Sequence, residues 1–189
     1  DVYKRQSHFY DIFRYQILDT NSYIEEIWAY GYWAIDRCAR IIKEGASFKE
    51  VTKGDLTEVE GCIAQAYAIK ALCSFYLTNM FGLPYSEAHK TTLGIVNVTE
   101  PVPAYSQVSR VSVEQNYSLI LDDITKAKEY YAKEGVENVG KQYMNTAAVA
   151  ALEARVKLYM KNYEGAITAA QEAITLSGGT IVSTKEDYK

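Results

Sequence analysis

The feature that most constrains the fold of this chain is an unbroken helical pattern over residues 57–81. Its apolar positions fall on one broad face, which is typical of a helix buried between neighbours. Gly82 and Pro84 follow at once. Glycine tolerates the left-handed conformation that closes many helices, and proline cannot extend a helix. We therefore predict that residues 57–81 form a central helix that ends at Gly82.

Four more stretches carry apolar residues at helical spacing, which predicts helices over residues 22–44, 112–133, 145–160 and 163–177. Gly45 is the expected stop of the first of these helices. Three of the five expected helices begin with a hydroxyl residue followed three positions later by Glu or Gln, the pattern of a capping box. The pairs are Ser22 with Glu25, Thr57 with Glu60, and Ser112 with Gln115.

The last two expected helices are rich in alanine and are separated by only two residues. Small residues let antiparallel helices approach closely, and we expect Ala154 to lie opposite Ala166 or Ala170. This hairpin resembles a tetratricopeptide repeat, and it needs neighbours because it cannot bury both of its faces alone. Helices 57–81 and 112–133 are compatible with a second, diverged hairpin.

Residues 82–111 hold all three prolines of the chain and show no clear amphipathic period. Loops of this length tend to be functional or to cover another part of a protein. The expected fold class is therefore all-α: tetratricopeptide-like helical hairpins with one long irregular loop.

The composition excludes several partners. The net charge is −4, and without a block of Lys or Arg we expect no nucleic-acid partner. No run approaches the ~18 apolar residues of a transmembrane span. Cys38, Cys62 and Cys73 lack the spacing of metal ligands, and we expect them to be small buried hydrophobes. The spacing does not decide whether Cys38 forms a disulfide with one of the others.

The sequence offers little catalytic chemistry. His8 and His89 are the only histidines, and neither lies in a motif for a nucleophile or a zinc ion. Asp122 and Asp123 point in different directions on an expected helix, so one is expected to face solvent and the other to pair with a base. We expect no enzyme activity, no catalytic residue, no metal and no cofactor.

Four aromatic residues cluster in the first long helix: Trp28, Tyr30, Tyr32 and Trp33. Trp28 and Tyr32 share a helical face with Ile35, which favours core packing. Tyr30 and Trp33 are expected to be partly exposed. They would then serve either as a packing surface or as a ligand platform, and periodicity leaves this choice open.

Four segments resemble, in order, the sequence pattern of the SusD/RagB family. They are residues 28–37, 66–85, 109–127 and 146–166. Two positions depart from the pattern. Lys70 stands where the family usually has Arg, and Leu83 leaves no room for the residue that commonly follows Gly82.

The resemblance implies a nutrient-binding lipoprotein of the bacterial outer membrane, which passes oligosaccharides to a TonB-dependent, SusC-like channel. It also implies that residues 7–189 are the N-terminal helical, tetratricopeptide-like domain of a longer protein, truncated at both ends and without the lipid-anchor segment. Residues 1–6 look like a translated sequencing adapter. The alternative to this interpretation is a tetratricopeptide-type adaptor that binds other proteins.

In the family the ligand pocket comes mostly from segments outside this chain, so the ligand-binding residues stay unknown. We expect the chain by itself to act as a scaffold that binds no glycan. If it does bind one, the first residues to mutate are Tyr30, Trp33, Tyr85 and Tyr105.

Overall fold

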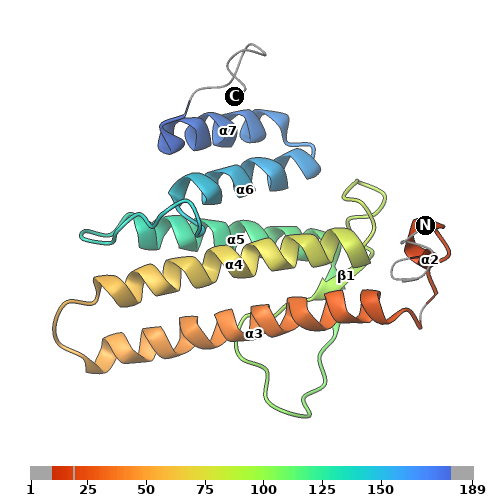
Figure 1. The fold of residues 1–189 in the computed structure, drawn as a ribbon, viewed down its shortest axis with the longest axis horizontal. Helices are drawn as coiled ribbons and strands as arrows, with labels where there is room; N and C mark the ends of the chain where they lie inside the picture. The colour runs from red at the N-terminus through yellow and green to blue at the C-terminus, as the bar shows by residue number, and fades with distance from the viewer. Residues whose placement is uncertain (1–9, 19, 180–189) are drawn as a thin grey trace, which may run out of the picture.

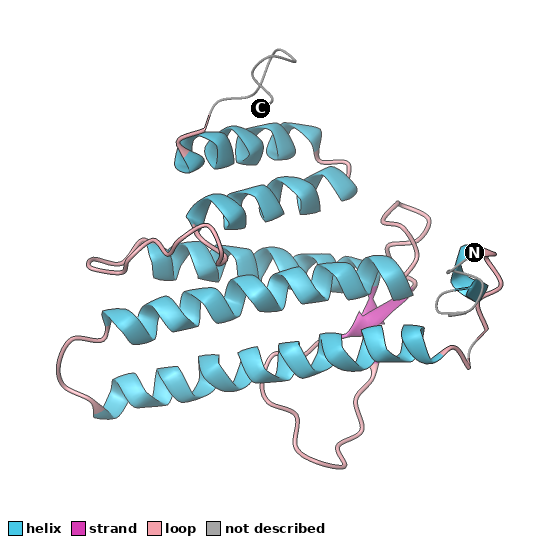
Figure 2. Ribbon diagram, viewed as in Figure 1, coloured by secondary structure: helices cyan, strands magenta, loops and turns pink. Residues whose placement is uncertain are grey.

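The computed structural model describes residues 10–18 and 20–179. Most of the described residues lie in helices, which confirms the predicted helical fold class (Figures 1 and 2). In chain order the elements are α2 (Tyr10–Phe13), α3 (Ser22–Val51), α4 (Thr57–Phe81), β1 (Leu93–Val96), β2 (Arg110–Ser112), α5 (Val113–Tyr131), α6 (Thr146–Tyr159) and α7 (Tyr163–Ser177).

The five long helices form a stack in which each packs on the next along the chain, from α3 at one end to α7 at the other (Figure 1). Helices α4 and α5 pack along each other, and so do α6 and α7, which confirms both predicted hairpins. The stack continues from one pair to the next through contacts between α5 and α6.

The main core lies where α4, α5 and α6 meet. Three fully buried alanines of α4, Ala64, Ala68 and Ala71, lie in the same cluster as large apolar side chains of α5. Tyr117 is among these side chains and is only 1% exposed. Small residues on one helix leave room for large ones on the next, which gives an interior packed as densely as an organic crystal.

The helix starts differ from the prediction at two of three places. The side chain of Asn21 caps α3 by accepting the backbone N–H groups of residues 23 and 24, so Ser22 is not the cap. Leu56 precedes α4 and makes no capping bond with its side chain, so the Thr57 box is also wrong. The Ser112–Gln115 capping box at the start of α5 is confirmed. Sequence pattern alone does not distinguish Asn21 from Ser22, because both residue types cap well.

The prediction that the first helix stops at Gly45 is wrong, since α3 continues to Val51. A Cβ atom on Gly45 would lie 2.8 Å from Cδ1 of Ile63. Glycine is therefore needed here because α4 approaches the backbone of α3 closely. The predicted end of α4 is confirmed, although Gly82 is extended with φ −105°. A Cβ there would lie 2.7 Å from the carbonyl oxygen of Thr78.

The segment between α4 and α5 is less irregular than predicted. Strands β1 and β2 form a small antiparallel sheet near the C-terminal end of α4 (Figure 2). The buried side chain of Asn116 holds this sheet in place. Its Oδ1 accepts the N–H of Ile95 at 2.7 Å, and its Nδ2 donates to Oδ1 of Asn97 at 2.6 Å. Gly94 lets this amide approach, because a Cβ atom there would lie 1.9 Å from its oxygen.

The three cysteines are free thiols, as the structure shows for each of them. Cys38 is buried, as expected, but Cys73 is only half-buried and Cys62 is exposed. Burial raises the pKa of the Cys38 thiol to about 11, so this thiol stays protonated and unreactive at neutral pH.

Candidate functional site

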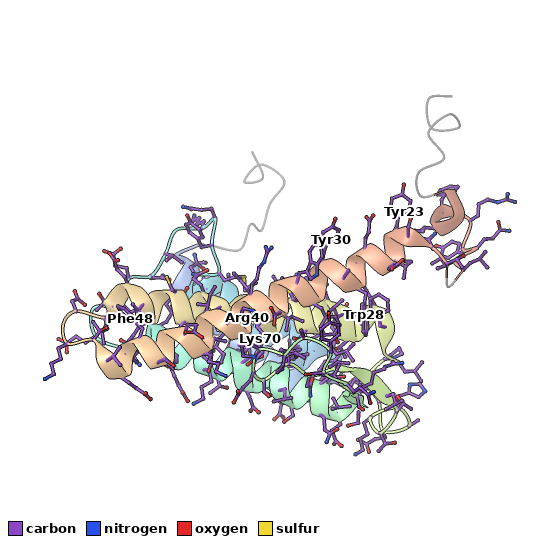
Figure 3. The ribbon with its side chains drawn as sticks, turned by 90° about the horizontal axis from the view of Figure 1, so that it is seen from below. Tyr23, Trp28, Tyr30, Arg40, Phe48 and Lys70 are labelled. Carbon is purple, nitrogen blue, oxygen red and sulfur yellow. The ribbon has the colours of Figure 1, made fainter. Side chains whose placement is uncertain are left out.

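The aromatic cluster on α3 divides between two faces of the helix, as predicted. Trp28 and Tyr32 pack against the cluster formed by α3, α4 and β1, and the ring of Trp28 meets that of Phe81 edge to face at 4.9 Å. Tyr30 and Trp33 are 60% and 58% exposed. Figure 3 shows Tyr30 on the outer side of α3 and Trp28 on the side toward the rest of the protein.

Tyr32 ties α3 to the end of β1. Its hydroxyl donates to the carbonyl oxygen of Val96 at 3.0 Å and accepts the N–H of the same residue at 2.8 Å. Burial raises the pKa of Tyr32 to about 12, against a smaller opposing effect of the Val96 hydrogen bond and the charge of Arg110. The phenol is therefore neutral at physiological pH, and this connection does not change with pH in that range.

A groove of about 350 Å³ lies between α3 and the segment that follows β1. Its apolar lining comes from the Trp28, Tyr32 and Trp33 rings on one side. On the other side it comes from four valines, Val96, Val98, Val102 and Val108. These valines were not predicted as part of a site. The available signal was weak, since only Val96 and Val98 alternate as strand residues do.

Charged groups lie at the edge of this groove. Asp36 lines it, and Asp36 also lines an adjoining hollow of about 210 Å³ together with Trp33 and Arg37. The carboxylate of Asp36 accepts a bond from Nε of Arg40 at 2.7 Å and another from Nη2 at 3.3 Å. These bonds place the carboxylate beside Arg40 on the exposed surface of α3.

Two other predicted candidates lie apart from this arrangement. Tyr85 packs edge to face on Tyr117, with ring centroids 5.0 Å apart, and belongs to the border of the main core. Tyr105 is fully exposed in the segment after β1, with a positive φ of 63°. Of the four candidates, the structure brings Tyr30 and Trp33 into ring contact, at 5.2 Å.

The buried charges of the helical stack form a pair. Nζ of Lys70 lies 2.8 Å from Oδ1 of Asp123, with both side chains about 10% exposed. Asp122 is exposed, so the predicted division of roles between the two aspartates is confirmed. Burial raises the pKa of Asp123, and the charge of Lys70 opposes this rise. The pair joins α4 to α5 and lies at a hollow of only about 10 Å³, too small for a substrate.

A second charge cluster is half-buried. Glu60 bonds both Lys49 and Lys133, and these bonds lower its pKa, with Lys133 the larger contributor. Nζ of Lys133 also lies 4.0 Å from the centre of the Tyr130 ring. These contacts join α3, α4 and the end of α5, and all of the charges involved are satisfied within the protein.

Among residues 10–18 and 20–179, no group of three or more His, Cys, Asp or Glu side chains is placed to hold a metal ion. His89 contacts the carbonyl oxygen of Pro84 at 3.2 Å. His8 lies outside the described residues. None of the helices in the described part of the chain has both the length and the apolar character of a membrane span.

Comparison with known proteins identifies the family. A SusD-like family model, described as "Starch-binding associating with outer membrane", matches residues 2–158. No curated protein sequence gives a match. A SusD superfamily protein from Bacteroides thetaiotaomicron VPI-5482 is 28% identical over 85% of this chain, with a TM-score of 0.73.

Two solved structures from Bacteroides vulgatus ATCC 8482 are also similar. A SusD superfamily protein is 25% identical over 86% of this chain, with a TM-score of 0.73. A SusD-like carbohydrate-binding protein is 16% identical over 86% of the chain, with a TM-score of 0.70, and it shows likeness of fold.

The chain covers 34%, 36% and 33% of these three proteins, about a third of their length. The family model, in contrast, matches most of this chain. The match agrees with the resemblance found in the sequence, and the solved structures show the same helical stack. The protein belongs to the SusD-like family.

Proposed function

We propose that this protein is a surface lipoprotein of the outer membrane that binds glycans and works with a TonB-dependent channel in oligosaccharide uptake. The observation that carries the proposal is the family match over residues 2–158. The helical stack shared with the SusD superfamily protein of Bacteroides thetaiotaomicron supports it. In this role the glycan is bound and passed on unchanged, so the proposal includes no enzyme activity.

Binding of polysaccharide can be tested by affinity electrophoresis. The protein is run in native gels cast with soluble starch, laminarin or xylan, beside a gel without polysaccharide. We expect slower migration in at least one polysaccharide gel, with serum albumin as a protein that keeps its mobility. Equal mobility of the folded protein in every gel would contradict glycan binding.

The channel partnership needs a separate test. We expect a tagged form of the protein, expressed in a Bacteroides host and purified from detergent-solubilised outer membrane, to bring a TonB-dependent channel with it. Recovery without any such channel, from membranes that contain it, would contradict this part of the proposal.

A further inference from the structure

We infer that Trp33 and Asp36 form a binding subsite for a pyranose oligosaccharide on the outer edge of α3. This inference rests on the proposed glycan binding and deepens it, because it places one contact with the glycan within this chain. It departs from the scaffold role expected from the family resemblance. Three features of the α3 surface support it: its shape, its chemistry and its rigidity.

The shape fits a chain of sugar rings. Trp33 and Asp36 border both the groove of about 350 Å³ and the adjoining hollow of about 210 Å³. The larger space falls within the range of roughly 300–1,000 Å³ of small-molecule sites. A ligand that occupies both spaces passes the same indole and carboxylate, which suits an oligosaccharide better than a single sugar.

The chemistry fits a ligand with an apolar face and a polar edge. A pyranose ring presents C–H groups on its faces and hydroxyl groups around its rim. The indole of Trp33 is 58% exposed and can stack on such a face, which removes apolar surface of both partners from water. Asp36 lies three positions after Trp33 on the same helix, and its carboxylate can accept hydrogen bonds from sugar hydroxyl groups. Hydrogen bonds to a charged acceptor are stronger than those between neutral groups.

The subsite is held in place before a ligand arrives. Tyr30 meets the Trp33 ring edge to face at 5.2 Å, and Arg40 orients Asp36 through two bonds of an exposed pair. Across the groove, Val96 is fixed by the two hydrogen bonds of Tyr32. Groups ordered in advance reduce the entropy lost on binding, so a small contact area can still contribute to affinity.

The Arg37 side chain borders the hollow beside Trp33. A guanidinium group donates hydrogen bonds to the hydroxyl groups of a neutral sugar and also to the carboxylate of a uronic acid. Both ligands share the stacking face that Trp33 recognises, so the test includes both.

The test is fluorescence polarisation with labelled malto-, laminari-, xylo- and galacturono-oligosaccharides. We expect at least one of them to bind the protein saturably. Trp33→Ala should then weaken binding at least about tenfold, as truncation of a central Trp does at many interfaces. Asp36→Asn should weaken it several-fold, because the amide keeps the shape but loses the charged acceptor.

Tyr163→Ala is the matched control. Tyr163 is 60% exposed, close to the value of Trp33, but lies on α7 at the other end of the stack. The control should bind like the unmodified protein, and circular dichroism should show that all three variants keep their helices.

The possible failures are distinct. Saccharide binding that Trp33→Ala leaves unchanged overturns the subsite and keeps the proposed function. A folded protein that binds no saccharide in any assay overturns both.

Discussion

The buried Lys70–Asp123 pair gives a quantitative prediction about how α4 and α5 are held together. Both side chains are about 10% exposed and lie 2.8 Å apart. Lys70→Met removes the cation and leaves a buried carboxylate without its partner. Breaking a buried pair in this way costs about 3–5 kcal/mol. For a chain of this size the cost corresponds to a fall in melting temperature of roughly 6–20 °C.

The sign of the pH dependence gives a second readout. Burial already raises the pKa of Asp123, and Lys70 opposes this rise. Without Lys70 the pKa should rise further. The unpaired charge then destabilises the fold at a pH above this raised pKa. Acidification through the pKa neutralises Asp123, so Lys70→Met should recover part of its lost stability relative to the unmodified protein as the pH falls.

Two further variants separate pairing from general damage. In Lys70→Met/Asp123→Leu neither charge remains, and we expect stability near that of the unmodified protein, since apolar replacements of buried pairs are often neutral. Lys126→Met breaks an exposed pair with Glu129, about half exposed on each side, and should cost at most about 1 kcal/mol. The assay is urea unfolding followed by circular dichroism. A loss below about 1 kcal/mol in Lys70→Met would refute the reasoning.

Three more predictions concern stability. Lysine contacts lower the pKa of Glu60, so its contribution to folding stability is fully present above the ordinary pKa of 4.5 and is lost as the pH falls through the lowered pKa. Glu60→Gln should therefore lose less stability than the unmodified protein on acidification, as measured by urea titrations. Gly94→Ala should displace the Asn116 amide and cost roughly 2–4 kcal/mol; an unchanged urea midpoint would show that the strand can shift. The sequence predicts that Ala154, which is half-buried on α6, lies at the α6–α7 contact. Ala154→Leu should then overpack this contact and cost roughly 1–3 kcal/mol, which an unchanged melting temperature would contradict.

Hydrophobic periodicity predicted the helical stack because burial of one helix face leaves a repeating trace in the sequence. It did not predict where α3 ends. Gly45 looks like a stop signal, but its role depends on Ile63 in another helix, and such a contact leaves no local trace. The same holds for Glu60, which matches a capping box yet bonds Lys49 and Lys133 instead.

The candidate site was likewise predicted only in part. The exposure of Trp33 and the packing of the half-buried Trp28 on the core follow from their places on one helix, and both were predicted. The groove was not predicted, because its second wall comes from residues that lie about 60 or more positions further along the chain. The fold of the 82–111 segment depends on the Asn116 amide, whose partners in β1 cannot be read from local sequence.

Calorimetric titration of the protein with plant, host and microbial oligosaccharides tests the central claim most directly. The account predicts saturable heat with at least one pyranose oligosaccharide, and a weaker affinity for the same ligand in Trp33→Ala. Absence of heat from the whole panel, with a protein shown to be folded, would contradict the proposed glycan binding.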